Sequence, residues 1–496
     1  MTIRTIPLAN FNYIVEKSTT WVYYVGKRIS GKESFFIMYQ INFEEPIHVH
    51  FIGIGGISMS GLAQILIGAG FTVSGSDARR SPITEHLTAM GAIINYPQMA
   101  GNITPDIDLV VYTAAIAPDN PEYMAVVEHA IPLMTRADLL GQIMKNYQMP
   151  IAISGTHGKT TTTSMLSEVL LAADMDPTLS IGGILKSIGG NIRVGKSDYF
   201  VTEACEYTNS FLSFFPRISI ILNIEEDHLD FFKDIDDIRH SFHRFAQLLP
   251  KDGFLIINND IDNMHALTDD LNCTVVTFGR DASADYSYTE VSYDTLGRGT
   301  YTLLKNGAPD GTVSLGVVGE HNILNSLSVI ALTDILGIDR TVVQHAFSHF
   351  SGTDRRFELK GTIGGVTILD DYAHHPTEIT ATLKAAANYP HKTLWCVFQP
   401  HTYSRTKAFL QDFAKALMPA DRIILTDIYA AREKNTIGIT SADLQREVEK
   451  LGKECLYFRT FDQIENFLLE NCIDGDLLIT MGAGDVVKIG ENLLGI

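Results

Sequence analysis

The sequence predicts an α/β protein of three domains, because a strand, a turn and a helical pattern follow one another three times, and the first two of these turns are glycine-rich. The three series begin at residues 47–51, 151–153 and 366–369. Strands that alternate with helical patterns are typical of βαβ units and parallel sheets. At roughly 100–200 residues per domain, a chain of 496 residues has room for two to four such units.

Domain boundaries are expected where the pattern is interrupted, near residues 147–150 and 351–354. A polar stretch over residues 281–312, with tyrosines spread along it, predicts a small β-meander inside the middle domain. The expected division is an N-terminal extension over 1–45, a first domain over 46–147, a central domain over 148–354 and a C-terminal domain over 355–496.

The extension over residues 1–45 does not fit the pattern. Residues 1–37 contain aromatic side chains without clear periodicity, and they lack the basic start, apolar core and small-residue cleavage site of a signal peptide. A second methionine, Met38, stands just before the first well-patterned strand. Our hypothesis is that translation begins at Met38 and that the segment before it either is not native or forms a poorly ordered arm.

The glycine-rich turn of the first domain allows two interpretations. Gly53, Gly55, Gly56 and Ser58 approximate a dinucleotide fingerprint, and Asp77 follows the next strand near a ribose-reading position. That pattern taken alone suggests NAD. Ser58 stands in place of the third glycine, however, and no hydride-transfer site lies nearby. A nucleotide diphosphate on the same helix N-terminus fits equally well.

The strongest signal is a phosphate loop in the central domain, between a β-branched strand and an apolar helical pattern. Glycines there let backbone N–H groups converge on phosphate oxygens, and the helix N-terminus adds positive potential. Lys159 supplies a point charge, and Thr160 is placed to bind Mg²⁺. The loop reads Gly155-Thr156-His157-Gly158-Lys159-Thr160-Thr161-Thr162.

Carboxylates and a histidine follow the next two predicted strands. Glu203 ends one strand, Glu206 is three residues on, and His228 follows the second strand in an acidic setting. Strand ends are where α/β sheets bind ligands, and Mg²⁺ takes one or two carboxylates besides phosphate oxygens. Glu203 is the predicted metal ligand, and His228 is expected to bind a second divalent ion or the transferred phosphate.

Two asparagines begin a later apolar helix. Asn322 and Asn325 are placed either to read an adenine edge or to cap the helix, and the sequence does not decide between these roles.

The C-terminal domain carries cations and carboxylates after predicted strands, which phosphoryl and acyl-phosphate chemistry uses. His374 and His375 have little support as a zinc pair, because no further ligand is suitably spaced in the sequence. The clusters are Arg355-Arg356-Phe357-Glu358, Asp370-Asp371, His374-His375 and Gln399-Pro400-His401-Thr402-Tyr403-Ser404-Arg405.

Composition excludes several classes of protein. A net charge of −20 argues against a nucleic-acid-binding surface, and no run approaches the roughly 18 apolar residues of a membrane span. Five scattered cysteines without a CxxC pair favour free thiols in a reducing compartment, so we expect a cytoplasmic protein. The oligomeric state stays open, with a homo-oligomer among the alternatives.

Over residues 47–496 the chain resembles the Mur ligases. Five motifs carry the resemblance. They are the phosphate loop, Asp227-His228-Leu229-Asp230, Gly319-Glu320-His321-Asn322 with Asn325, Arg355-Arg356-Phe357-Glu358 and Asp371-Tyr372-Ala373-His374-His375-Pro376. It implies a Rossmann-like UDP-sugar domain, a central P-loop ATPase domain with a parallel sheet and a Rossmann-like C-terminal domain. Within the family, the first glycine loop, the histidine of the phosphate loop and Gln399-Pro400-His401 resemble members that add L-alanine.

The resemblance also implies an activity and residue roles. ATP would phosphorylate the carboxylate of UDP-N-acetylmuramate, and the amine of L-alanine would displace the phosphate, with Mg²⁺ as cofactor. The implied roles are phosphate binding by Lys159, metal binding by Thr160, Glu203 and His228, adenine contacts by Asn322 and Asn325, closure onto ATP by Arg356 and Asp371, and contacts to alanine and acyl phosphate by His401 and Arg405.

Two positions depart from many relatives, Cys205 within the carboxylate segment and Thr402 where an arginine follows the histidine. The nearest alternative is a ligase that adds a whole tripeptide to the same UDP-sugar. A folylpolyglutamate-type ligase, a nucleotide-sensing binding protein and an NAD-dependent dehydrogenase fit less well.

Overall fold

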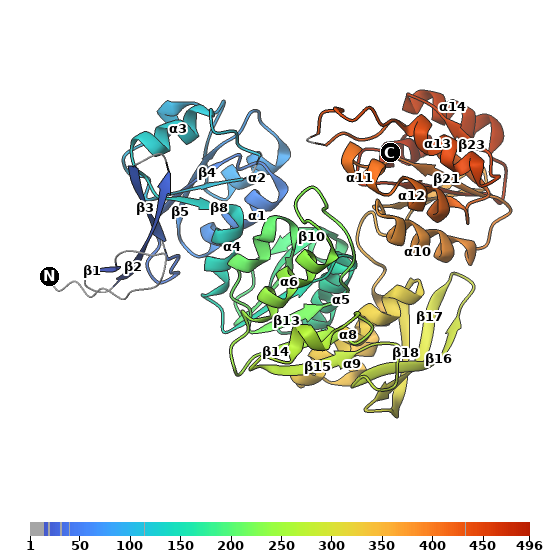
Figure 1. Ribbon diagram of the computed structural model, residues 1–496, viewed down its shortest axis with the longest axis horizontal. Helices are drawn as coiled ribbons and strands as arrows, with labels where there is room; N and C mark the ends of the chain where they lie inside the picture. The colour runs from blue at the N-terminus through green and yellow to red at the C-terminus, as the bar shows by residue number, and fades with distance from the viewer. Residues whose placement is uncertain (1–13, 18–19, 30–31, 39, 114, 432) are drawn as a thin grey trace.

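The computed structural model describes residues 14–17, 20–29, 32–38, 40–113, 115–431 and 433–496. Figure 1 shows three α/β bodies, with the first domain beside the central one and the C-terminal domain above its far end. The predicted fold class, three α/β domains, is confirmed.

The described part of the N-terminal extension is a separate antiparallel sheet of β1 (Ile14–Lys17), β2 (Thr20–Ile29) and β3 (Lys32–Met38). Residues 1–13, on which part of the hypothesis about Met38 rests, lie outside the described residues. That hypothesis stays a prediction.

A five-stranded parallel sheet in the order β6-β5-β4-β7-β8 forms the first domain. Its central strand, β4 (His48–Ile52), buries Val49 and Phe51, and α1 (Ile57–Gly68) follows directly after the glycine turn. The other elements are β5 (Thr72–Ser76), α2 (Pro82–Ala89), β6 (Ile93–Asn95), β7 (Leu109–Tyr112), α3 (Pro121–Glu128), β8 (Leu133–Thr135) and α4 (Arg136–Met144).

The central domain holds a ten-stranded sheet in the order β11-β10-β12-β9-β13-β14-β15-β16-β17-β18. The strands β9 (Met149–Ser154), β12 (Tyr199–Ala204), β13 (Ile218–Ile221), β14 (Phe254–Asn258) and β15 (Thr274–Phe278) are parallel. The predicted meander is present as β16 (Tyr286–Tyr293), β17 (Arg298–Lys305) and β18 (Ala308–Val318), which pair antiparallel. The remaining elements are β10 (Thr178–Leu185), β11 (Gly190–Arg193), α5 (Lys159–Ala172), α6 (Ile235–Ala246), α7 (His265–Thr268), α8 (Glu320–Ile335) and α9 (Arg340–His349).

In the C-terminal domain the sheet order is β19-β20-β24-β21-β22-β23, in which β19 is the antiparallel edge strand. The strands are β19 (Glu358–Ile363), β20 (Val366–Asp371), β21 (Leu394–Phe398), β22 (Arg422–Leu425), β23 (Cys455–Tyr457) and β24 (Leu477–Met481). The helices are α10 (Pro376–Ala387), α11 (Tyr403–Ala408), α12 (Leu410–Leu417), α13 (Ser441–Lys450), α14 (Phe461–Asn471) and α15 (Val487–Leu494).

Strand register gathers the predicted site residues at one sheet edge. Ser154, the last residue of β9, stands opposite Ala204 of β12 and Ile221 of β13. The loops that follow these three strands therefore begin at the same level, as expected at the carboxyl edge of a parallel sheet. The phosphate loop, the Glu203–Glu206 segment and the segment around His228 are brought together in this way.

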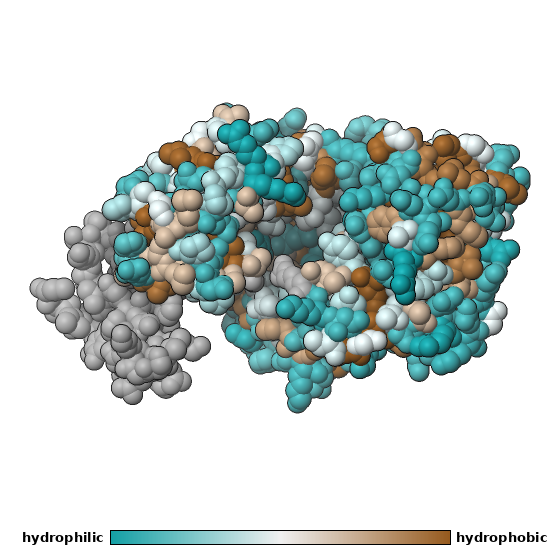
Figure 2. All heavy atoms as spheres, turned by 90° about the horizontal axis from the view of Figure 1, so that it is seen from above, coloured by the Kyte–Doolittle hydropathy of each residue, from teal (hydrophilic) through white to brown (hydrophobic). Residues whose placement is uncertain are grey.

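The surface is mainly polar on the face that Figure 2 shows. Figure 2 shows a face that is mainly hydrophilic, with apolar residues in small groups among polar ones. Among the helices that the structure describes, none combines the length and the apolar character that crossing a membrane requires.

Candidate active site

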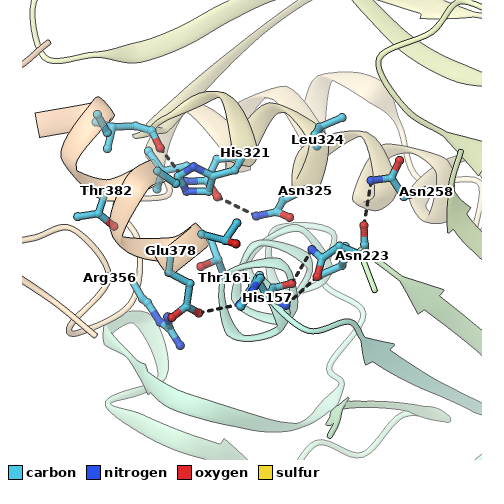
Figure 3. Close-up of a pocket in the computed structure, with 18 of the residues that line it drawn as sticks. His157, Thr161, Asn223, Asn258, His321, Leu324, Asn325, Arg356, Glu378 and Thr382 are labelled. Carbon is cyan, nitrogen blue, oxygen red and sulfur yellow. Dashed lines mark hydrogen bonds and ion pairs between the residues drawn. The ribbon is translucent and has the colours of Figure 1, made fainter. Parts of the chain in front are cut away.

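A cavity of about 480 Å³ lies between the central and C-terminal domains. This size suits a ligand such as a nucleotide, since small-molecule pockets commonly occupy ~300–1,000 Å³. Its wall is formed by the phosphate loop, the ends of β13 and β14, the start of α8, the segment around Arg356 and helix α10 (Figure 3). Its lining includes His157, Gly158, Thr161, Asn223, Glu225, Asn258, Arg280, His321, Asn322, Asn325, Arg356, Asp371, Glu378 and Thr382.

The phosphate loop requires glycine at two positions. Gly155 and Gly158 have φ angles of +145° and +84°, which L side chains rarely adopt. A Cβ atom on Gly158 would lie 2.9 Å from the Oδ1 atom of Asn325, and one on Gly155 would lie 2.9 Å from Cβ of Leu222. The loop can pack this closely against its neighbours only with glycine at these positions. Gly158 lines the cavity directly before the N-terminus of α5, where a phosphate group would bind.

We expect Gly158→Ala to weaken ATP binding at least tenfold and to lower the free energy of unfolding by about 1–3 kcal/mol, because it adds both backbone strain and a clash with Asn325. Nucleotide titration and denaturant unfolding measure the two effects. Gly189→Ala is the control, because Gly189 has a φ of +65° but no atom within 4 Å of its added Cβ. Equal ATP affinity in both variants would contradict the assigned role of the loop.

Lys159 lies at the start of α5 with its side chain mostly buried, and three acceptors contact its ammonium group. It donates to the carbonyl oxygens of Gly155 and Thr156 and lies 3.0 Å from Oε2 of Glu206. Burial alone would favour the neutral amine, but the Glu206 carboxylate outweighs it and raises the pKa of Lys159. Lys159 is therefore a fixed positive charge beside the cavity.

Thr160 and Glu203 meet next to the phosphate loop. The Thr160 hydroxyl donates to Oε2 of Glu203 over 3.0 Å, and the backbone N–H of Gly182 donates to Oε1 over 2.5 Å. Burial raises the pKa of Glu203, against the opposing effect of these hydrogen bonds. A hydroxyl and a carboxylate at this distance match the protein part of a Mg²⁺ site.

His228 has the backbone geometry of a specialised position, with a φ of +52°. Its Nε2 atom lies 3.7 Å from Oε1 of Glu206 and 3.7 Å from Oδ2 of Asp227, and its ring stacks on Tyr207. Burial lowers the pKa of His228, so the ring is neutral and able to bind a metal ion. Glu206 thus links Lys159 to His228.

Arg405 connects the C-terminal domain to the central one. Its Nη2 and Nε atoms donate to Oδ1 of Asp227 over 2.8 and 3.2 Å, and its Nη1 atom lies 3.2 Å from Nδ1 of His401. Burial opposes the ionisation of Asp227, but the guanidinium outweighs it and holds the pKa of Asp227 well below its usual range. The rings of His374 and Tyr429 flank His401, and burial lowers the pKa of His401 to about 4.

His157 lies between carboxylates of two domains. Its Nδ1 atom is 3.2 Å from Oε1 of Glu378 on α10, and its Nε2 atom is 3.6 Å from Oε2 of Glu225 (Figure 3). Burial alone would lower the pKa of His157, but the two carboxylates prevail and raise it to about 9. The protonated ring therefore contributes to the contact between the domains.

This pair makes stability depend on pH. Because the pKa rises from 6.5 to about 9 on folding, the ring contributes stability that is fully present below pH 6.5 and is lost as pH rises through 9. We expect His157→Gln to lower stability by up to ~3 kcal/mol at pH 6 and by much less at pH 10. Thermal unfolding of both proteins across this range is the measurement, and a pH-independent difference would contradict the assignment.

The two asparagines of α8 form one linked unit. Asn325 donates its side-chain amide to Oδ1 of Asn322 over 2.9 Å, and Asn322 donates to the carbonyl oxygen of Val318 over 2.7 Å. The N-cap position of α8 is occupied by Gly319, so neither asparagine is the N-cap. Both line the cavity.

The neighbouring arginines of the C-terminal domain have different surroundings. Arg355 pairs with Asp370 and donates to the carbonyl oxygens of Gly482 and Gly484, which joins β20 to the turn after β24. Arg356 lines the cavity and lies over the ring of Tyr372. Arg356 is therefore the arginine available to a ligand.

Asp371 also lines the cavity and holds the loop around it. Its carboxylate accepts hydrogen bonds from the backbone N–H groups of Phe357 and Ala373 over 2.8 and 2.7 Å. Burial raises the pKa of Asp371 to about 6.

The first glycine loop is organised by Asp77. Its Oδ2 atom accepts the N–H of Gly55 over 2.8 Å, and a Cβ on Gly55 would lie 2.7 Å from that oxygen. Gly53 has a φ of +82°, and Gly56 and Ser58 open helix α1. Asp77 therefore stabilises the conformation of this loop.

Several lining residues escaped the sequence reasoning. Glu378 stands three residues after the N-cap His375, which is the spacing of a helix capping box, and its carboxylate accepts the N–H groups of His374 and His375. Asn258 ends β14, and Arg280 lies near the start of the meander. No local pattern indicates that these two side chains face the same cavity.

Comparison with known proteins identifies the family. Residues 48–148 match the description "Mur ligase family, catalytic domain", residues 153–333 match "Mur ligase middle domain" and residues 355–484 match "Mur ligase, glutamate ligase domain". The chain belongs to the Mur ligase family. The resemblance expected from the sequence is confirmed.

Individual relatives in this family are similar over nearly their whole length. A UDP-N-acetylmuramate–L-alanine ligase of Lachnospira eligens is 62% identical over 92% of this chain and 100% of its own. The enzyme of the same name from Lachnoclostridium phytofermentans is 57% identical with the same coverage. The crystal structure of a UDP-N-acetylmuramate–alanine ligase of Thermotoga maritima has a TM-score of 0.75 and 30% identity, covering 90% of this chain and 98% of that one.

Proposed function

We propose that this Mur ligase joins L-alanine to the carboxylate of UDP-N-acetylmuramate, with ATP as co-substrate, in the synthesis of peptidoglycan precursors. The observation that carries the proposal is the 62% identity to a relative of that name, over the whole of the relative. The nucleotide-sized cavity beside the phosphate loop supports it, because amide formation from a carboxylate needs activation by ATP.

In the proposed reaction, the muramate carboxylate attacks the γ-phosphate and forms an acyl phosphate and ADP. The amine of L-alanine then adds to the acyl carbon, and the tetrahedral intermediate expels phosphate. Negative charge gathers on phosphoryl oxygens in the first step and on the acyl oxygen in the second, so fixed cations contribute most. Lys159 is proposed to serve the first step and Arg405 the second, with the neutral ring of His401 beside Arg405 as a hydrogen-bonding group.

Mg²⁺ is the proposed metal, held by Thr160, Glu203 and His228. The hydroxyl–carboxylate pair of Thr160 and Glu203 offers the oxygen ligands that Mg²⁺ prefers, and the neutral ring of His228 is proposed as an additional nitrogen ligand. When bound, the ion would neutralise phosphate charge. The chain's own contribution is to place these ligands beside Lys159 at the start of α5.

We propose that residues 148–354 bind ATP and that residues 355–496 close over it. Around the phosphates, the backbone N–H groups of the loop would act together with Lys159, Thr160 and Thr161. Asn322 and Asn325 would approach the adenine, while Arg356 and Asp371 approach from the other domain. The proposed loop residues are Gly155, Thr156, His157 and Gly158.

The first domain, over residues 46–147, is proposed to bind the UDP-sugar. Its phosphates would lie at the N-terminus of α1, beside the loop that Asp77 holds. The residues concerned are Gly53, Gly55, Gly56, Ser58 and Asp77.

The cytoplasm is the proposed site of the reaction. The five cysteines of the chain are free, which suits a reducing compartment. ATP and nucleotide-linked sugars are substrates of that compartment.

Phosphate release tests the choice of acceptor. The protein is given UDP-N-acetylmuramate and Mg-ATP, with L-alanine, glycine, L-serine or the cell-wall tripeptide as acceptor. We expect the highest kcat/KM with L-alanine. Release with the tripeptide but not with L-alanine would make this chain the tripeptide ligase, and no turnover with any acceptor would favour a nucleotide-binding protein without ligase chemistry.

A further inference from the structure

Three potential metal ligands from distant parts of the sequence converge where the phosphate loop meets α10. One ligand atom from each of His157, Glu225 and His375 lies within 4.8 Å of the other two. Within the residues that the structure describes, no other group of three or more histidine, cysteine, aspartate or glutamate side chains meets this distance. We propose that His157, Glu225 and His375 form a Zn²⁺ site between the central and C-terminal domains, separate from the Mg²⁺ site.

The donor set selects the ion. Two imidazoles and one carboxylate form a common three-ligand set for Zn²⁺, which keeps a fourth position for water or substrate, whereas Mg²⁺ prefers oxygen ligands. A tetrahedral ion with ligands at ~2.1 Å needs donor atoms about 3.4 Å apart. The 3.6 Å between Nε2 of His157 and Oε2 of Glu225 is close to that spacing. The remaining donor separations, which are at most 4.8 Å, would need to contract by up to about 1.4 Å to complete the site.

His157 already has the environment of a metal-binding histidine. Its Nε2 atom is buried and makes no hydrogen bond, and Zn²⁺ binding would release the proton that the ring holds in the metal-free protein. Its other ring nitrogen, Nδ1, lies 3.2 Å from the Glu378 carboxylate. A carboxylate on the far nitrogen is what orients metal-bound imidazoles and raises their basicity.

The other two ligands are supported in the same manner. Oε2 of Glu225 accepts a hydrogen bond of 2.7 Å from the Thr377 hydroxyl. Nε2 of His375 lies 3.1 Å from the carbonyl oxygen of Glu226, while its Nδ1 atom has only a long contact of 3.4 Å with the N–H of Thr377. Nδ1 is therefore the nitrogen of His375 that an ion would take most easily.

An ion at this position would join two domains. His157 belongs to the phosphate loop, Glu225 follows β13, and His375 is the N-cap of α10 in the C-terminal domain. His157 and Glu225 also line the nucleotide cavity. Zinc bound here would hold the phosphate loop against α10 and occupy part of the cavity wall.

Metal titration of the nucleotide-free, full-length protein tests the site directly. Co²⁺ serves as the spectroscopic probe, and Zn²⁺ is added to displace it. We expect the intense visible absorption of four-coordinate Co²⁺, abolished by one equivalent of Zn²⁺. Glu225→Gln and His375→Gln should each weaken Zn²⁺ binding at least tenfold.

Two controls separate this site from others. Glu203→Gln alters the proposed Mg²⁺ site, and the double variant His345→Gln, His349→Gln removes an exposed pair of histidines on α9 whose rings are 4.2 Å apart. Neither should change the Co²⁺ spectrum. Thermal unfolding without metal establishes that each variant is folded. Unchanged Zn²⁺ affinity in folded Glu225→Gln or His375→Gln, or loss of the spectrum in a control, would overturn the proposal. The readout needs no ligase activity, so it is independent of the proposed function.

Discussion

Lys159→Ala should reduce kcat for phosphate release at least ~10³-fold, because Lys159 is the fixed ammonium group at the start of α5, where the transferred phosphoryl group would gather negative charge. The change also leaves the buried Glu206 carboxylate without its 3.0 Å partner. Steady-state release of phosphate with saturating substrates is the measurement, and circular dichroism monitors folding.

Lys305→Ala is the matched control for this variant. Lys305 is in the same domain and also pairs with a carboxylate, that of Asp334 at 2.7 Å, but it lies on the meander. It should keep wild-type turnover. If Lys159→Ala remained active while folded, the assignment of the phosphate loop would be wrong.

Arg405→Ala should lower kcat/KM for L-alanine by about 10²–10³-fold. The variant removes the guanidinium beside His401 and breaks an ion pair whose two side chains are only 10% and 8% exposed. Breaking a buried pair costs about 3–5 kcal/mol, because the remaining charge has no partner. Since Asp227 and Arg405 belong to different domains, we expect part of this cost as weaker domain closure. Turnover against L-alanine concentration is the measurement.

Arg422→Ala is the control in the same domain. Arg422 pairs with Glu454 on the surface, where both side chains are more than half exposed. Pairs of that kind contribute little, so turnover should not change. Equal effects of the two substitutions would remove Arg405 from the site.

The fold was predictable because its signals are local. The first two domains open with a strand, a glycine-rich turn and a helix, and the alternation of strands and helices in all three predicts parallel sheets. The meander was predictable for the same reason, since β16, β17 and β18 follow one another along the chain. Gly158 is required partly by its positive φ angle, which is a property of the turn itself, and partly by its close contact with Asn325, which is distant in sequence.

The placement of the candidate site residues was predictable only where they stand at strand ends or in the loops that follow them. Lys159, Thr160, Glu203 and His228 stand in that relation, and the structure places them around one sheet edge. No sequence pattern indicates which side chains form hydrogen bonds or ion pairs between different domains.

The contacts between domains illustrate this limit. Nothing in the spacing links His157 to Glu378, or Arg405 to Asp227, because each contact depends on how two separate domains face one another. The weak support for His375 as a metal ligand had the same cause, since its proposed partners lie more than 140 residues earlier in the sequence.

The central claim, ligation through an acyl phosphate, is tested most directly by isotope transfer. UDP-N-acetylmuramate labelled with ¹⁸O in its carboxylate is incubated with the protein, Mg-ATP and L-alanine, and the released phosphate is analysed by mass spectrometry. An acyl phosphate passes one carboxylate oxygen to phosphate, so we expect one ¹⁸O atom per phosphate, with ADP as the other product. Phosphate without ¹⁸O, formed while the amide accumulates, would contradict the mechanism.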